Sequence, residues 1–245
     1  MGVLFTIAYD GTNYCGWQTQ INAVSVQDVF QSALKSVIGN SFGLLGASRT
    51  DAGVHAMGQR AHLICKNPIQ IPTKRLPYVL NGILPQDIKI IDAIDVPNSF
   101  HPISDAVSKT YTYCIINNSC NNPLKSRYCA FVPRYLNIST MQAAAKHFIG
   151  THDFAAFCST GTIVNTTTRT INFLNISKDD NIITITINGN GFLYNMVRII
   201  AGTLVDVGFG KTKADDIPDI ICSKSRQKCG KTMAAKGLTL QEVFY

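Results

Sequence analysis

The chain has 245 residues, of which 46% are hydrophobic and 15% are charged, with 22 Lys and Arg against 15 Asp and Glu. This composition excludes a disordered chain, and a chain of this length can bury a core without disulfides or metals. No apolar run approaches the roughly 20 residues that span a bilayer, and the first residues are typical of a strand and turn rather than a signal peptide. We therefore expect a cytoplasmic protein of one or two domains with no membrane segment.

The first half of the chain predicts the order βαββαβ. Its expected elements are a strand, a helix, two strands, a helix and a strand, at residues 3–9, 26–38, 42–47, 58–65, 73–81 and 87–94. Ser25 and Asp28 predict a capping box at the start of the first helix, and Gly39 predicts its end.

The second half predicts a similar series of strands and helices. These elements are expected at residues 109–117, 139–149, 169–177, 182–188, 192–207, 213–222 and 237–244. Pro97, Asn98 and Pro102 interrupt the pattern between the halves. We therefore predict an α+β fold of two ferredoxin-like, or RNA-recognition-like, βαββαβ halves, with helices on one face of antiparallel strands. The predicted domains are 1–104 and 105–245.

The cysteines and histidines do not form a metal-binding or disulfide pattern. Eight cysteines contain no C-x-x-C pair, and five histidines do not cluster at ligand spacings. Several cysteines lie in apolar, strand-like runs, where a free cysteine behaves as a small hydrophobic residue. We expect reduced, structural cysteines and no metal site.

A basic segment lies near the C-terminus. Five cationic residues occur between Ile220 and Gln241, where there is no acidic residue: Lys224, Arg226, Lys228, Lys231 and Lys236. Clustered cations bind nucleic acids by neutralising phosphates, but such a run also occurs in solvated surface loops. The segment alone leaves both interpretations open.

The segment Ala47 to Ala56 (ASRTDAGVHA) lies between two predicted strands. If its backbone is extended, Arg49 and Asp51 point to one face, and a guanidinium beside a carboxylate favours the ionised form that acts as nucleophile or base. The alternative is a plain turn at 50–53 in which Asp51 makes local hydrogen bonds.

Two other segments hold candidate side chains. Tyr111 and Tyr113 share a face of a strand, as a stacking platform for a base or as half-buried core residues. Arg198 has apolar neighbours on a helix, so it must reach solvent or pair with a carboxylate or phosphate, with Asp51 as one candidate. The turn 9–18 (YDGTNYCGWQ) is rich in aromatic and amide side chains, and its structural interpretation is a hairpin with a buried Trp, which we favour for Trp17 itself.

These motifs together resemble one family. They run in order along the chain: YDGTNYCGWQ at 9–18, SVQ at 25–27, SRTDAGVHAMGQ at 48–59, LNGILPQDI at 80–88, SFH at 99–101, KTYTY at 109–113, HDFAAF at 152–157, GFLYNMVRIIAG at 191–202 and KGLTL at 236–240. This ordered set resembles the TruA-type tRNA pseudouridine synthases.

The resemblance implies roles for five residues. Asp51 would be the catalytic aspartate that attacks the target uridine, and Arg49 the arginine that displaces the uridine from the stem and then pairs with the aspartate. Arg198 would orient the aspartate. Tyr111 would pack on the target base, and Leu238 would line the pocket.

The resemblance also implies the substrate and the assembly. The family converts uridine to pseudouridine at positions 38, 39 and 40 in the anticodon stem-loop of tRNAs, as a homodimer and without cofactor or metal. Many members carry basic residues where this chain has Ile103 and Thr112. We expect that difference to affect RNA affinity or the range of sites more than the chemistry.

Two other functions remain as alternatives. A non-catalytic RNA-binding protein of paired RNA-recognition-like modules would explain the charge and the aromatic residues, but not why Arg49, Asp51 and Arg198 occur together in their motifs. A metalloenzyme would use the cysteines and histidines but lacks the ligand spacing.

Overall fold

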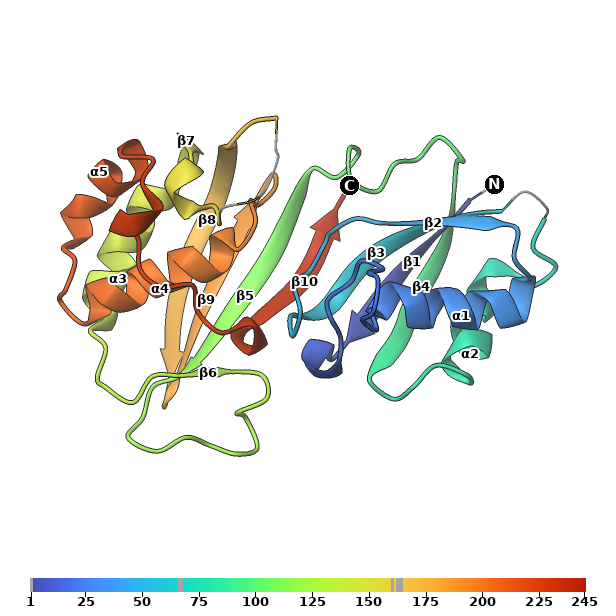
Figure 1. The fold of residues 1–245 in the computed structure, drawn as a ribbon, viewed down its shortest axis with the longest axis horizontal. Helices are drawn as coiled ribbons and strands as arrows, with labels where there is room; N and C mark the ends of the chain where they lie inside the picture. The colour runs from blue at the N-terminus through green and yellow to red at the C-terminus, as the bar shows by residue number, and fades with distance from the viewer. Residues whose placement is uncertain (1, 66–67, 160, 162–164) are drawn as a thin grey trace. The chain divides into compact units, whose positions relative to one another are not determined.

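A computed structural model describes residues 2–65, 68–159, 161 and 165–245. The chain divides into two compact units: a first unit, Met1–Val107 with Leu240–Tyr245, and a second unit, Ser108–Thr239 (Figure 1). The predicted division into domains after residue 104 stays a prediction.

The first unit has the predicted βαββαβ order. Its helices and strands are β1 (Gly2–Tyr9), α1 (Val26–Ile38), β2 (Phe42–Gly46), β3 (His55–Cys65), α2 (Leu76–Asn81) and β4 (Ile88–Val96). Short 3-10 helices lie at η1 (Gly11–Asn13) and η2 (Thr73–Arg75). β1 pairs antiparallel with β3 on one side and β4 on the other, and β2 pairs antiparallel with β3.

Helix α1 forms as the sequence predicts. The Ser25 side chain accepts a hydrogen bond from the Asp28 backbone N–H, the Asp28 side chain accepts one from the Ser25 backbone N–H, and Gly39 ends the helix. Phe30 of α1 meets Phe5 of β1 edge to face, with 5.3 Å between ring centroids. Because α1 also contacts α2, the two helices cover one face of this sheet.

The second unit contains strands, α-helices and 3-10 helices. The strands are β5 (Ser108–Ile116), β6 (Ala130–Phe131), β7 (Gly150–Asp153), β8 (Thr168–Asp179) and β9 (Ile182–Gly189). The α-helices are α3 (Ile138–Ala145), α4 (Met196–Gly208) and α5 (Ile217–Cys222). The 3-10 helices are η3 (Lys146–Phe148), η4 (Ala155–Phe157), η5 (Ala214–Asp216), η6 (Arg226–Lys228) and η7 (Ala235–Gly237). Strand β10 (Leu238–Phe244) begins in this unit, and its residues from Leu240 onward belong to the first unit, where β10 lies next to β3.

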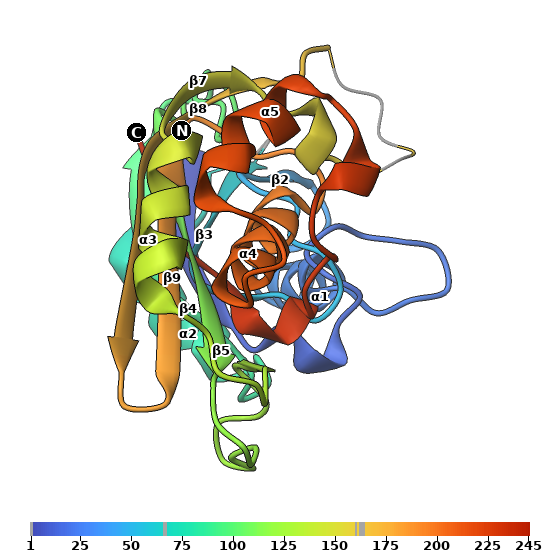
Figure 2. The same ribbon diagram turned by 90° about the vertical axis from the view of Figure 1, so that its left-hand side faces the viewer.

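The sheet of the second unit has the strand order β5-β9-β8-β7, with antiparallel pairs. Helix α3 contacts both α4 and β8 (Figure 2). Phe157 packs edge to face against Phe148 and Phe154, and all three side chains are fully buried. The fold is therefore α+β, as predicted.

The structure corrects several predicted helices and adds two strands. The predicted helices 73–81 and 213–222 each begin with a 3-10 helix, η2 and η5. Helix α4 begins at Met196 rather than at 192, because Asn195 has a left-handed backbone with φ 62° that a continuing helix does not allow. Helix α3 ends at Ala145, and 3-10 helix η3 follows it to Phe148. Strands β6 and β7 were not predicted, because two and four residues give no clear period of two. The repeat of one unit in the other stays a prediction.

All eight cysteines are free. Among the described residues, no three His, Cys, Asp or Glu side chains gather as a metal site would require. In the same part of the chain, no helix combines the length and apolar character needed to cross a membrane.

His62 of β3 gives the first unit a pH-dependent stability. Its side chain is 1% exposed and meets Phe100 edge to face, and burial lowers the pKa of His62 below its ordinary value of 6.5. The unfolded chain therefore binds a proton at a higher pH than the folded protein does. We expect the contribution of His62 to the free energy of unfolding to be fully present well above pH 6.5 and to be lost as the pH falls below it, by at most about 1.4 kcal/mol per pH unit.

Urea unfolding of wild type and of His62→Phe between pH 5 and 8 measures this dependence. The variant should lose the part of the slope that His62 contributes. An equal slope in both proteins would show that His62 does not contribute.

Candidate active site

In the loop between β2 and β3, Asp51 is the first residue of a turn. The Val54 backbone N–H donates to the Asp51 carbonyl at 3.1 Å, and Gly53, the third residue of the turn, has φ 75°. This geometry is typical of a type II turn, which favours glycine at that position. This turn spans Asp51 to Val54, one residue later than the turn at 50–53 that the sequence offered as an alternative. Its first residue is the half-buried Asp51, so a turn and a functional carboxylate are compatible.

Residues on both sides fix the loop before Asp51. The Gln59 side chain is fully buried, accepts a hydrogen bond from the Ser48 N–H at 3.2 Å and donates to the Ser48 carbonyl at 2.6 Å. The Thr50 hydroxyl shares a hydrogen bond of 2.7 Å with the Tyr9 hydroxyl, and the Thr50 carbonyl accepts from the Trp17 N–H at 3.1 Å. These contacts hold the backbone on the N-terminal side of Asp51.

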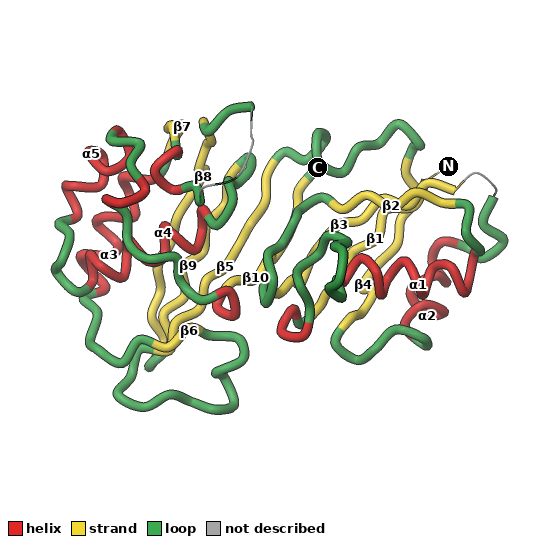
Figure 3. Tube along the Cα trace, in the orientation of Figure 1, coloured by secondary structure: helices red, strands yellow, loops and turns green. Residues whose placement is uncertain are grey.

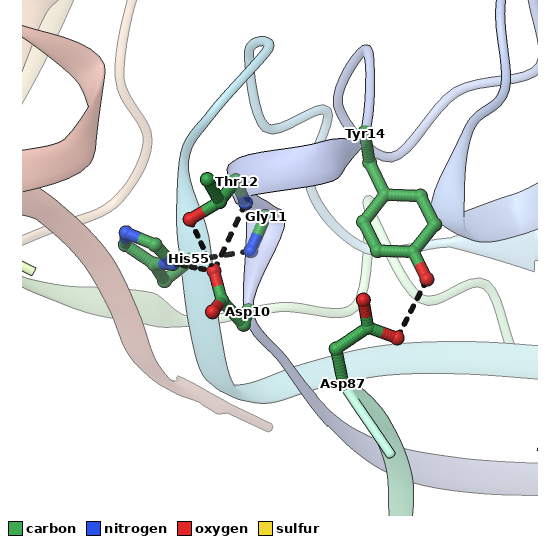
Figure 4. A network of polar contacts seen from close by, with 6 residues as sticks. All are labelled: Asp10, Gly11, Thr12, Tyr14, His55 and Asp87. Atoms are coloured by element: carbon green, nitrogen blue, oxygen red, sulfur yellow. Dashed lines mark hydrogen bonds and ion pairs between the residues drawn. The ribbon is translucent and has the colours of Figure 1, made fainter. Parts of the chain in front are cut away.

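A polar network fixes the other end of the loop (Figure 4). The His55 Nδ1 accepts a hydrogen bond from the Gly11 N–H at 3.1 Å and lies 3.2 Å from Asp10 Oδ1. Asp10 also accepts from the Thr12 N–H at 3.0 Å and so caps η1. The loop therefore ends on a residue that contacts the turn after β1.

The turn after β1 is itself held to the start of β4. The Tyr14 hydroxyl donates to Asp87 Oδ1 at 2.7 Å, and the Asp10 N–H donates to the Asp87 carbonyl at 2.9 Å. Burial and the neighbouring Asp87 carboxylate raise the pKa of Tyr14 above its usual range, so this hydroxyl remains a donor. The segment that supports Asp51 thus follows β1 and is anchored to His55 at the start of β3 and to Asp87 just before β4.

Segment 9–18 forms η1 (Gly11–Asn13) and bends rather than the predicted hairpin, and it contacts the loop that holds Asp51. Trp17 is 1% exposed and stacks on Tyr9 with 6.2 Å between ring centroids, which confirms the predicted burial. Sequence analysis assigned no role to Gln59, Thr50 or His55. A glutamine on a predicted strand, 58–65, was the signal that could have found Gln59, because a buried amide needs hydrogen-bond partners.

Arg49 is exposed, whereas Thr50 is buried and Asp51 is half-buried. The exposed guanidinium is available for contact with an anionic ligand from solvent. The pairing of Arg49 with Asp51 stays a prediction.

In the second unit, Arg198 lies in the first turn of α4 and binds neutral oxygens. Its Nε donates to the Met233 carbonyl at 2.8 Å, and its Nη1 donates to the Asn195 side-chain oxygen at 2.6 Å. The Met233 N–H returns a bond of 3.2 Å to the Arg198 carbonyl. The bonds with Met233 fix the direction of the Arg198 guanidinium relative to the segment before η7. The pairing of Arg198 with Asp51 stays a prediction.

The two tyrosines of β5 are both buried. Tyr113 is fully buried and donates its hydroxyl to the Ala234 carbonyl at 2.7 Å, and burial raises the pKa of Tyr113 above its usual range. Tyr113 is therefore a core residue, as one of the two interpretations held. Tyr111 is 8% exposed and meets Phe192 edge to face, with 5.2 Å between ring centroids.

Leu238 is the first residue of β10 and is 6% exposed. Gly237 before it has no side chain, and a Cβ there would lie 2.7 Å from the Tyr113 ring and 2.9 Å from the Cys114 carbonyl. Glycine thus lets the chain pass close to β5 just before Leu238.

The structure separates the basic segment into two groups. Lys224 forms an ion pair with Asp153 at 2.7 Å, and Arg226 donates to the Gly230 carbonyl and the Thr232 hydroxyl. These two cations have partners within the second unit. Lys228 and Lys231 are exposed and Lys236 is half-buried.

Comparison with known proteins places the chain among enzymes that isomerise uridine in tRNA. A family model described as tRNA pseudouridine synthase matches residues 6–103 and 144–245. The protein named tRNA pseudouridine synthase A from Thermoanaerobacter sp. (strain X514) is 49% identical over 243 residues, which cover 99% of both chains. The protein of that name from Acetivibrio thermocellus is 47% identical with the same coverage.

The chain belongs to the tRNA pseudouridine synthase family, as its motifs suggested. Arg49, Asp51, Arg198 and Leu238 lie within the two matched segments, and Tyr111 lies between them.

Proposed function

We propose that this protein converts uridine to pseudouridine at positions 38, 39 and 40 of the tRNA anticodon stem-loop, with Asp51 as the nucleophile. The observation that carries the proposal is the Asp51 turn, which Gln59, Thr50 and His55 anchor on both sides. Nucleophilic catalysis depends on holding the attacking group in a defined place, and anchoring the backbone on both sides of Asp51 serves that purpose.

In the proposed reaction, the target uridine is flipped out of the stem so that Asp51 can reach it. The carboxylate attacks C6 of the base or C1′ of the ribose, and the bond between N1 and C1′ breaks. The base then rotates and forms a bond between C5 and C1′. The C5 hydrogen leaves as a proton, and the carboxylate is released.

The other predicted residues assist this step. The exposed Arg49 would enter the space that the flipped uridine leaves and then pair with Asp51. Arg198, held by Asn195 and Met233, would orient the carboxylate, while Tyr111 packs on the base and Leu238 lines the pocket. We further propose that the protein acts in the cytoplasm as a homodimer, without a cofactor.

Release of tritium tests the reaction and its positions together. The substrate is a tRNA transcript labelled at uracil C5, made in three versions that each keep one uridine among positions 38, 39 and 40. We expect release from each version and none from a transcript with no uridine at these positions. Binding without release from any transcript would contradict the proposal and favour the non-catalytic RNA-binding alternative.

Lys228 and Lys231 are expected to contact tRNA phosphates. Both are exposed, whereas Lys224 and Arg226 have partners within the second unit. Reversing both charges (Lys228→Glu with Lys231→Glu) should weaken tRNA binding and reduce the slope of log affinity against log salt by roughly 1.5 for two contacts.

The control for this variant is Lys178→Glu, which reverses an exposed charge on β8. Filter binding at several salt concentrations measures all the proteins. An unchanged slope in the double variant would show that these lysines are merely solvated.

A further inference from the structure

Two cysteines face each other at the base of the long loop between β5 and β6. The strands pair in parallel, with Ile115 opposite Ala130 and Ile116 opposite Phe131. The register therefore places Cys114 opposite Cys129. Neighbouring strands lie about 4.8 Å apart, within the range of about 4.4–6.8 Å that disulfides bridge between Cα atoms.

The base of this loop is fixed, whereas its interior is exposed. The Val132 N–H donates to the Ile116 carbonyl at 2.9 Å, and the buried Asn117 side chain donates to the carbonyls of Val132 and Arg134. Residues 118–125 are all exposed, and the loop extends well away from the strands before it closes at β6 (Figure 3). The two cysteines are thus held together by the hydrogen bonds of the surrounding chain.

The side chains of the pair are in contact. The Cys129 thiol hydrogen-bonds to Cys114, and the Thr184 hydroxyl of β9 also bonds to Cys114. These bonds lower the pKa of Cys114, and the same contact together with burial raises the pKa of Cys129. Cys114 is therefore the member of the pair that more readily forms a thiolate, which is the reactive form in disulfide exchange.

We propose that Cys114 and Cys129 form a redox modification site, which a small-molecule disulfide such as oxidised glutathione converts reversibly into an intrachain disulfide. The site is separate from the uridine chemistry and uses no residue assigned to it. The proposal rests on the strand register, the contact between the thiols and the hydrogen bonds that hold the base of the loop.

The exchange balances in two steps. The Cys114 thiolate attacks one sulfur of oxidised glutathione, forms a mixed disulfide and releases one glutathione thiolate. The Cys129 thiol then loses its proton and attacks Cys114 sulfur, which releases the second glutathione. The protein loses two hydrogen atoms, and the oxidant is reduced to two thiols.

Trypsin offers a direct readout, because the cleavage sites separate the two cysteines. Complete digestion places Cys114 in the peptide 110–125 (TYTYCIINNSCNNPLK) and Cys129 in the peptide 128–134 (YCAFVPR). The full-length protein is first reduced, then treated with oxidised glutathione, alkylated to block remaining thiols and digested. Mass spectrometry should find the two peptides joined, and treatment with dithiothreitol should separate them.

The exposed Cys120 shares the first peptide with Cys114, so variants must identify the partner. We expect the joined peptides in Cys120→Ser and not in Cys114→Ser or Cys129→Ser. The oxidised Cys120→Ser protein should also unfold at a temperature raised by roughly 5 °C, because the bond closes a loop in the unfolded chain.

Three results would overturn the proposal. The first is full alkylation of Cys114 and Cys129 in wild type after oxidation, and the second is linkage that persists in Cys114→Ser. The third is linkage that disappears in Cys120→Ser, which would assign the reaction to the exposed thiol. None of these readouts depends on synthase activity, so they are independent of the outcome for the proposed function.

Discussion

Replacing Asp51 by Asn should abolish pseudouridine formation while leaving tRNA binding almost unchanged. Removing the nucleophile of a covalent mechanism lowers turnover by at least about 10⁴-fold, because the remaining groups cannot form the intermediate. The backbone of the turn needs no carboxylate, since the bond from the Val54 N–H goes to the Asp51 carbonyl. Tritium release under single-turnover conditions gives the rate, and filter binding gives the affinity.

A matched control removes a carboxylate elsewhere. Asp179→Asn makes the same chemical change at an exposed position at the end of β8 and should keep full activity. If Asp51→Asn retained more than about a hundredth of wild-type turnover, Asp51 would not be the nucleophile. Loss of both binding and activity together with a lower unfolding temperature would instead show a structural role for this side chain.

Replacing Gly16 by Ala should destabilise the fold and lower activity. Gly16 has φ 91°, and a Cβ there would lie 2.3 Å from the Thr50 carbonyl oxygen and 3.0 Å from the Asp51 carbonyl carbon. The backbone strain and the overlap each cost about 1–3 kcal/mol, so we expect a loss of about 2–6 kcal/mol in the free energy of unfolding. Because the atoms that must move belong to Thr50 and Asp51, turnover should fall even in protein that stays folded.

Two other glycines separate strain from overlap. Gly210 also has a positive φ, of 75°, but a Cβ there meets nothing within 4 Å, so Gly210→Ala reports strain alone. Gly43 has an ordinary φ and open space, so Gly43→Ala should have little effect. Urea unfolding compares the three variants. A Gly16→Ala protein that is no less stable than Gly210→Ala would show that the loop moves freely away from segment 9–18.

The sequence was most informative where local rules decide the structure. Helix α1 has its predicted bounds because the capping box and Gly39 act within a few residues of the helix ends. The strands of the first unit follow from short hydrophobic runs between turn residues. The family also followed from the sequence, because the motifs occur in order along the whole chain and the family model matches most of it.

The sequence was less informative where distant contacts decide the structure. The start of α4 depends on the left-handed Asn195, whose side chain bonds to both Ser159 and Arg198. Nothing in the apolar run 192–207 shows those bonds. The two-residue strand β6 likewise exists only because it pairs with β5, whose register partners lie fifteen residues earlier in the chain.

For the candidate site, the sequence by itself predicted which residues would carry the chemistry, above all Asp51 in its motif. Only the tertiary structure decided how that residue is held: by Gln59, by the Tyr9 hydroxyl on Thr50 and by His55 at the turn after β1. It also showed that Lys224 and Arg226 have partners within the second unit, which leaves Lys228 and Lys231 to solvent. The physical reason is that the bonds of Thr50 to Tyr9 and of His55 to Gly11 join residues more than forty positions apart, so they depend on the folded chain and no local pattern encodes them.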